Sequence, residues 1–140
     1  MQSTPFTHAV RIYWEDTDAG GIVFYANYLK FMERGRTEWL RSLGIEQQRL
    51  RDDVGGMFVV REANIKYLQP ARLDDELLVT AQLQQAGRAS MTIAQQVLLK
   101  QKQPTDTPQL LCEGTICIGW VDAASMRPAR IPQTLLQTIS

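Results

Sequence analysis

The chain is poor in histidine and cysteine and carries no net charge, and each shortage excludes a class of function. Its 15 Lys and Arg balance 15 Asp and Glu, and no basic cluster stands out, which argues against nucleic acid as a partner. No apolar run reaches the ~20 residues that cross a bilayer, so no membrane insertion is expected. Residues 1–7 lack the basic and apolar regions of a secretory signal, so we expect a cytoplasmic location.

Metal and redox chemistry are also disfavoured. Cys112 and Cys117 fall within one predicted strand at an odd spacing, which places them on opposite faces and prevents a bridge between them. The single histidine, His8, is far from both in sequence, so the three do not resemble a zinc set. We expect reduced, buried cysteines, a structural His8, and no metal or cofactor.

What is present suits one folded unit. The length of 140 residues and the hydrophobic content of 44% predict a single domain, 1–140, with its own core. Near its start, Val10, Ile12 and Trp14 alternate with other residues and predict a strand over 8–14. A loop rich in turn residues is expected over 16–21.

Apolar residues at helical spacing then predict a long helix over 27–43, with Gly44 as its C-terminal stop. Further strands are expected at 58–69, 77–85, 89–100 and 110–121, with short helices at 45–53 and 135–139. The links between consecutive strands are short, which favours antiparallel pairing. The predicted class is α+β, with one antiparallel sheet of about five strands curled around the long helix.

One charged residue interrupts the apolar face of the predicted helix. That face comprises Tyr28, Phe31, Met32, Gly35, Trp39 and Leu43, widened by Leu29 and Leu40. Arg36 falls inside this arc, where a cation needs a partner. Glu33 lies three residues back at the edge of the arc and can pair with it. We favour a structural ion pair that orients the helix over a catalytic role for these two residues.

A short segment before the helix carries the residues suited to chemistry. Asp16 and Asp18 are followed by Gly20 and Gly21 and then by the helix start. A carboxylate can act as nucleophile or base, and free N–H groups at a helix N-terminus can hold an oxyanion. The glycines permit backbone conformations and close approaches that a side chain would block. The alternative is that Asp18 simply caps the helix or binds loop amides.

The motifs in and around this segment resemble a known family. They are Tyr13-x-x-Asp16-Thr17-Asp18-x-x-Gly21-x-Val23-x-x-x-x-Tyr28, Phe31-Met32-Glu33-x-x-Arg36, Phe58-Val59-Val60-Arg61, Tyr67-x-x-Pro70-Ala71-Arg72-Leu73-Asp74-Asp75 and Met126-Arg127-Pro128-x-x-Ile131-Pro132. The combined pattern resembles the hotdog-fold acyl-CoA thioesterases, in the YbgC-type branch that is similar to 4-hydroxybenzoyl-CoA thioesterase. The resemblance covers nearly the whole chain.

This resemblance implies a hotdog fold, homodimers or homotetramers with active sites between subunits, and hydrolysis of an acyl-CoA thioester without a cofactor. It places the catalytic carboxylate at Asp18 and the carbonyl-polarising backbone N–H at Tyr25. Many YbgC-type members have His where this chain has Tyr25, whereas the hydroxybenzoyl relatives have Tyr. A backbone donor survives that exchange, but an imidazole proton donor does not.

Several roles stay open at this stage. Asp18 either attacks the thioester carbon or activates a water as general base, and we read Asp16 as orienting or structural. In extended chain the two carboxylates would point the same way. Candidate cations for the CoA phosphates are Arg61, Lys66, Arg72, Arg88, Lys100 and Lys102. The other readings are a hotdog dehydratase or hydratase, which generally needs a suitably placed His, and a binding module for acyl thioesters or acyl carrier protein in lipid synthesis or the cell envelope.

Overall fold

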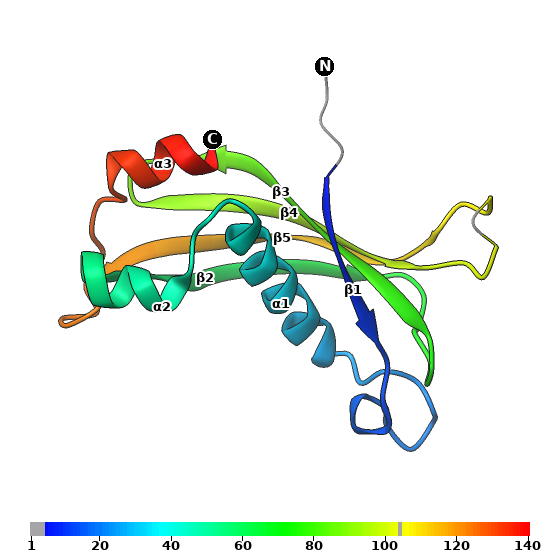
Figure 1. Ribbon diagram of the computed structural model, residues 1–140. Helices are drawn as coiled ribbons and strands as arrows, with labels where there is room; N and C mark the ends of the chain where they lie inside the picture. The colour runs from blue at the N-terminus through cyan, green and yellow to red at the C-terminus, as the bar shows by residue number, and fades with distance from the viewer. Residues whose placement is uncertain (1–4, 104) are drawn as a thin grey trace.

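One antiparallel sheet wraps around one long helix in the computed structural model, which describes residues 5–103 and 105–140 (Figure 1). The strands run in the order β1-β3-β4-β5-β2, and each neighbouring pair is antiparallel. The elements are β1 Phe6–Arg11, η1 Trp14–Asp16, α1 Asn27–Ser42, α2 Gln47–Arg49, η2 Leu50–Val54, β2 Gly56–Tyr67, β3 Glu76–Ala86, β4 Ser90–Leu99, β5 Gln109–Asp122 and α3 Gln133–Ile139. The predicted α+β hotdog architecture is confirmed.

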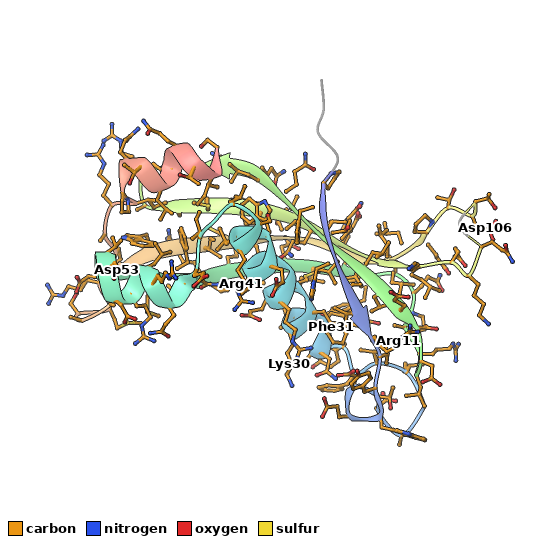
Figure 2. All side chains as sticks on the ribbon, in the orientation of Figure 1. Arg11, Lys30, Phe31, Arg41, Asp53 and Asp106 are labelled. Carbon is orange, nitrogen blue, oxygen red and sulfur yellow. The ribbon has the colours of Figure 1, made fainter. Side chains whose placement is uncertain are left out.

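The core lies between α1 and the concave face of the sheet. Phe31 and Met32 on α1 are almost fully buried, as is Ile93 on β4. The neighbouring Lys30 is exposed, and Figure 2 locates it beside Phe31 near the start of the helix. Gly44 follows α1 with a φ of +83°, the left-handed conformation that ends many helices. Apolar periodicity therefore placed the helix and its stop correctly.

The first strand differs from its prediction. It spans Phe6–Arg11 and includes His8, and the chain then turns into the η1 turn at Trp14–Asp16. Trp14 is consequently 80% exposed, although alternation had placed it on the buried face with Val10 and Ile12. The local turn, closed by a bond from Asp16 N–H to the Tyr13 carbonyl, breaks the period of two.

The predicted ion pair on α1 is also wrong. The buried Arg36 donates from Nη1 to Oε1 of Gln95 on β4, at 3.0 Å, and Glu33 accepts a bond from Thr37 instead. Burial lowers the pKa of Arg36 below its ordinary value, and the nearby Glu33 carboxylate offsets part of this shift. Leu29, which was expected to widen the apolar face, is 44% exposed.

Two loops meet at one end of the sheet, below the start of α1 in Figure 1. Beyond the last β1–β3 pair, Ile12 exchanges backbone bonds with Asp74 and Asp75. The segment that follows β1 is thereby held against the segment that follows β2. Arg11, labelled in Figure 2 at the end of β1, donates to the Asp74 carbonyl. Within the described residues, no helix has the length and apolar character needed to cross a membrane.

Candidate active site

The loop before α1 is closed by its own backbone. Thr17 and Val23 form an antiparallel bridge, and Asp18 N–H donates to the Ile22 carbonyl at 2.9 Å. Gly21 N–H donates back to the Asp18 carbonyl at 3.0 Å. Gly21 has a φ of +80°, which a residue with a side chain adopts only at a cost. The tight turn over residues 18–21 therefore requires this glycine.

The Asp18 carboxylate is held at one oxygen. Its Oδ1 accepts a hydrogen bond from Gly20 N–H at 2.8 Å, while the side chain as a whole is exposed. No protein donor within the described residues bonds to Oδ2. The turn thus fixes the direction of the carboxylate and leaves one oxygen open toward solvent.

Asp16 is engaged differently. Its Oδ2 accepts from Tyr13 N–H at 2.9 Å, and its backbone carbonyl accepts from Asn27 Nδ2 at 2.8 Å and from Phe24 N–H at 3.1 Å. Because Asp16 belongs to the η1 turn, the extended geometry that would have pointed it the same way as Asp18 does not apply. Asp16 links η1, the loop and the start of α1.

The start of α1 presents free backbone donors. Its first turn is closed by bonds between residues three apart, from Asn27 to Phe24, Tyr28 to Tyr25 and Leu29 to Ala26. Ala26 occupies the N-cap position, so no side chain caps the helix. Within the parts of the chain that the structure describes, the N–H groups of Tyr25 and Ala26 have no hydrogen-bond partner. They form a donor pair at the positive end of the helix dipole.

A pocket of about 300 Å³ opens beside Tyr25. Its walls are Ile22, Val23, Tyr25, Tyr28, Tyr67, Leu68, Gln69 and Pro70. Tyr67 contacts two tyrosines edge-on, with its ring centroid 6.0 Å from that of Tyr25, just before α1, and 5.5 Å from that of Tyr28 on α1. Tyr28 is buried, as predicted, and its hydroxyl accepts from Ala71 N–H at 3.0 Å. Burial raises the pKa of this hydroxyl, and the bond from Ala71 offsets part of the rise.

The candidate cations are scattered. Arg72 adjoins the loop through its backbone bridge to Ile22, whereas Lys100 pairs with Glu76 at 3.6 Å. Arg88 lies in a separate pocket with Arg130. In residues 5–103 and 105–140, no three His, Cys, Asp or Glu side chains gather closely enough to hold a metal ion.

Reasoning from local sequence missed Asn27 and Ala71 as parts of this arrangement. Asn27 links the helix to Asp16. The N–H of Ala71 donates to the Tyr28 hydroxyl, and the carbonyl of Ala71 accepts from Val23 N–H at 2.9 Å. Ala71 has no polar side chain, so only its place in the Tyr67-to-Asp75 motif marked it. The asparagine at the helix start was the one available signal for the Asp16 link.

Comparisons with known proteins identify the family of the chain. A family model described as the thioesterase superfamily matches residues 20–104. An acyl-CoA thioesterase YbgC of Haemophilus influenzae is 38% identical over 133 residues, which cover 95% of this chain and 93% of the relative. The family model covers α1 and the strands β2, β3 and β4, and the match to the relative covers nearly the whole chain.

Solved structures agree on the fold. A probable thioesterase from Bartonella henselae is 29% identical with a TM-score of 0.83, covering 92% of this chain and 100% of that one. The 4-hydroxybenzoyl-CoA thioesterase of Pseudomonas sp. strain CBS-3 superimposes with a TM-score of 0.86 at 19% identity, covering 97% and 99%, and supports the fold alone. The chain therefore belongs to the thioesterase superfamily of hotdog-fold enzymes, in its YbgC-type branch.

Proposed function

We propose that this protein hydrolyses acyl-CoA thioesters to a free acid and CoA, with Asp18 as its catalytic carboxylate. The observation that carries the proposal is a carboxylate bonded at one oxygen, in the loop directly before a helix start that no side chain caps. One oxygen of the Asp18 carboxylate has no donor within the described part of the chain. The bridge between Thr17 and Val23 brings the Asp18 segment alongside that of Tyr25. The names of the YbgC relatives, acyl-CoA thioesterase and acyl-CoA thioester hydrolase, support the substrate class.

Two routes are compatible with this arrangement. In one, the Asp18 carboxylate attacks the thioester carbon, the carbon–sulfur bond breaks, CoA leaves as thiolate, and water hydrolyses the resulting mixed anhydride. In the other, Asp18 takes a proton from a water that attacks the same carbon. In both, negative charge develops on the carbonyl oxygen. Thiolate is a good leaving group, so neither route requires a histidine as acid.

The backbone N–H of Tyr25 is the proposed donor to that oxygen. It has no partner within the described residues, and losing one donor of this kind typically costs about 3 kcal/mol of transition-state stabilisation. Gly21 and Asp16 support the loop in this proposal, and the Tyr25 ring lines the adjacent pocket. Glu33 and Arg36 are assigned supporting roles on α1, away from the reacting atoms.

A second copy of the chain is the proposed partner. Strand β2 is twelve residues long and lies at an edge of the sheet, so one side of its backbone is unpaired by any described strand. Edge pairing of two β2 strands would build a homodimer, and two dimers a homotetramer. The cytoplasmic location stays a prediction of the sequence.

The alternative is a binding module for acyl thioesters or acyl carrier protein that does not turn them over. The loop geometry around Asp18 would serve binding as well, because a free carboxylate and free N–H groups also recognise polar ligands. The two functions differ in one observable, which is release of a free thiol.

The deciding experiment measures thiol release from acyl-CoA esters with short, long and aromatic acyl groups. Asp18→Asn removes the charge and basicity but keeps the shape, so we expect kcat to fall about 10²- to 10⁴-fold. Asp16→Asn is the matched control, because its amide oxygen can still accept from Tyr13 N–H. Tyr25→Phe keeps the backbone N–H and is also expected to retain kcat.

Circular dichroism and the oligomeric state check that each variant folds. Near-wild-type turnover in Asp18→Asn would contradict the assignment of the carboxylate, and a large loss in Tyr25→Phe would contradict the backbone-donor role. If the wild-type protein releases no thiol from any ester but binds acyl carrier protein, the binding module is the correct reading.

A further inference from the structure

Gln95 is a buried amide that lies between two apolar residues on the inner face of β4. Along β4, the alternate residues Ile93, Gln95 and Val97 face α1, and all three are at most 1% exposed. A buried amide costs free energy unless its donors and acceptor are bonded. The bonds of Gln95 therefore identify what it does at this position.

Its side chain ties three elements together. Nε2 donates to the Met32 carbonyl of α1 at 3.0 Å and to the Thr80 carbonyl of β3 at 3.1 Å, while Oε1 accepts from Arg36 at 3.0 Å. Met32 and Arg36 lie on successive turns of one helix stripe. A single amide on β4 thus holds α1 at two points and joins it to the adjacent strand.

The pairing of β3 with β4 is irregular beside this amide. The β3–β4 pairs stop at Val79↔Val97 and resume at Gln82↔Ala94, so the ladder is interrupted next to Gln95. At this interruption Gln96 N–H donates to the Thr80 hydroxyl at 2.8 Å. The carbonyl of Thr80 is thereby available to the Gln95 amide.

On the helix, a glycine faces this part of the sheet. A Cβ at Gly35 would lie 2.7 Å from Cγ1 of Val79 and 3.3 Å from Nε2 of Gln95. The first distance is shorter than any ordinary contact, so a side chain at this position would push α1 away from the sheet. Gly35 and Gln95 together define one seating of the helix on the sheet.

We infer that Gln95 is a positioning residue, which sets where the start of α1 lies relative to Asp18 and so places the Tyr25 N–H for the reaction. Met32 follows Asn27 by five residues, about 7.5 Å along the axis at 1.5 Å per residue. The other ties at the helix start, from Asn27 and Tyr28, lead to loops, whereas Gln95 ties the helix to the sheet itself. The inference rests on the proposed function.

The test compares two Gln95 variants with a matched control. Gln95→Met has similar length and no hydrogen bonds, and Gln95→Glu still accepts from Arg36 but loses the amide donors to Met32 and Thr80. Because a misplacement of about 1 Å can cost 10²-fold in rate, we expect both to lower kcat by about 10- to 100-fold with little change in KM. Ile93→Val removes one methyl group from the same buried face and is expected to leave kcat unchanged.

A second readout does not depend on turnover. Backbone amide chemical shifts of residues 25–31 should move in both Gln95 variants and stay in place in Ile93→Val. Unchanged kcat and unchanged shifts in folded Gln95→Met would overturn the inference. A full kcat in Gln95→Glu would also overturn it, because pairing with Arg36 would then be the whole role. A wild-type protein without hydrolase activity contradicts the proposed function, while the amide shifts still decide the role of Gln95.

If the Gln95 variants do not fold, Gly35 gives an independent route to the same displacement. Gly35→Ala should lower kcat, since its Cβ meets Val79. Adding Val79→Ala makes room for that Cβ and should restore much of the rate. Equal kcat in the wild type and the single variant, or no restoration in the double variant, counts against the inference.

Discussion

At the scale of single residues, environment assigns different tasks to identical side chains. Asp16 and Asp18 are two positions apart, yet the carboxylate of Asp16 accepts from Tyr13 and supports the loop. The carboxylate of Asp18 accepts from Gly20 at Oδ1, and no donor among residues 5–103 and 105–140 bonds to its second oxygen. The two cysteines also differ in their environments. Cys112 is buried among core residues, and Cys117 is half-buried on the opposite face of β5.

The cysteines give a prediction about pH. Burial raises the pKa of the Cys112 thiol from 9.0 to about 11, with a smaller contribution from Glu113. The folded state therefore holds this proton more tightly than the unfolded chain. Its contribution to stability is complete below the unfolded pKa and is lost as the pH rises from 9 toward 11. In unfolding curves, the stability advantage of the wild type over Cys112→Ala should shrink across that range.

Thiol reactivity checks the same assignment without unfolding. The native Cys112→Ala variant keeps the thiol of Cys117, and the native Cys117→Ala variant keeps the thiol of Cys112. At about pH 8, below the ordinary thiol pKa, the first variant should react with a disulfide reagent faster than the second. Equal rates for the two native variants would show that Cys112 is accessible and would remove the basis for its raised pKa.

At the scale of elements, α1 carries the site because its two ends are built differently. Its start lacks a side-chain cap, and the N–H groups of Tyr25 and Ala26 find no partner among the residues that the structure describes. Its end is closed by Gly44 in the left-handed conformation. The start serves the proposed chemistry and the end serves stability. Changes at the two ends should therefore separate activity from stability.

Gly44→Ala tests this separation. A left-handed conformation costs an alanine about 1–2 kcal/mol, partly offset by lower entropy of the unfolded chain. We expect a loss of about 1 kcal/mol in the free energy of unfolding in urea, with kcat unchanged. Gly87→Ala is the control, because its φ is not positive and its Cβ would meet only the Ser90 carbonyl at 3.4 Å. Equal stability of both variants would contradict the role of Gly44.

The elements also show how far sequence reasoning reaches. The helix and its stop at Gly44 follow from local periodicity, which the tertiary fold did not override. Trp14 was misplaced because β1 ends at Arg11 and the chain turns at Trp14–Asp16, although the alternation of apolar residues continues through Trp14. The partner of Arg36 was misassigned to Glu33 because Gln95 lies 59 residues away and is brought close only by the sheet. The residues themselves marked Asp16 and Asp18 as carboxylates before a helix start, and the family resemblance assigned catalysis to Asp18 and the backbone donor to Tyr25. Both roles stay predictions.

At the scale of the whole molecule, the two faces of α1 are unequally covered. One side is buried against the sheet, but beside β2 the chain leaves a hollow of about 560 Å³. Leu29, Lys30, Glu33, Arg34, Arg36, Val60, Ala63 and Ile116 line it. A largely apolar hollow next to a long edge strand is where a second copy would bury the most apolar surface. This location agrees with the proposed pairing through β2.

Val60→Lys tests that assembly. Val60 is 53% exposed in the single chain, so a lysine there should not disturb folding, but it would place a charge in the hollow beside Lys30 and Arg34. Burying an unpaired charge is costly, so we expect a shift toward monomer in light scattering across a range of concentrations. Val54→Lys is the matched control, since Val54 is 52% exposed but belongs to η2. If Val60→Lys keeps the wild-type mass while Val54→Lys loses it, the interface does not lie along β2.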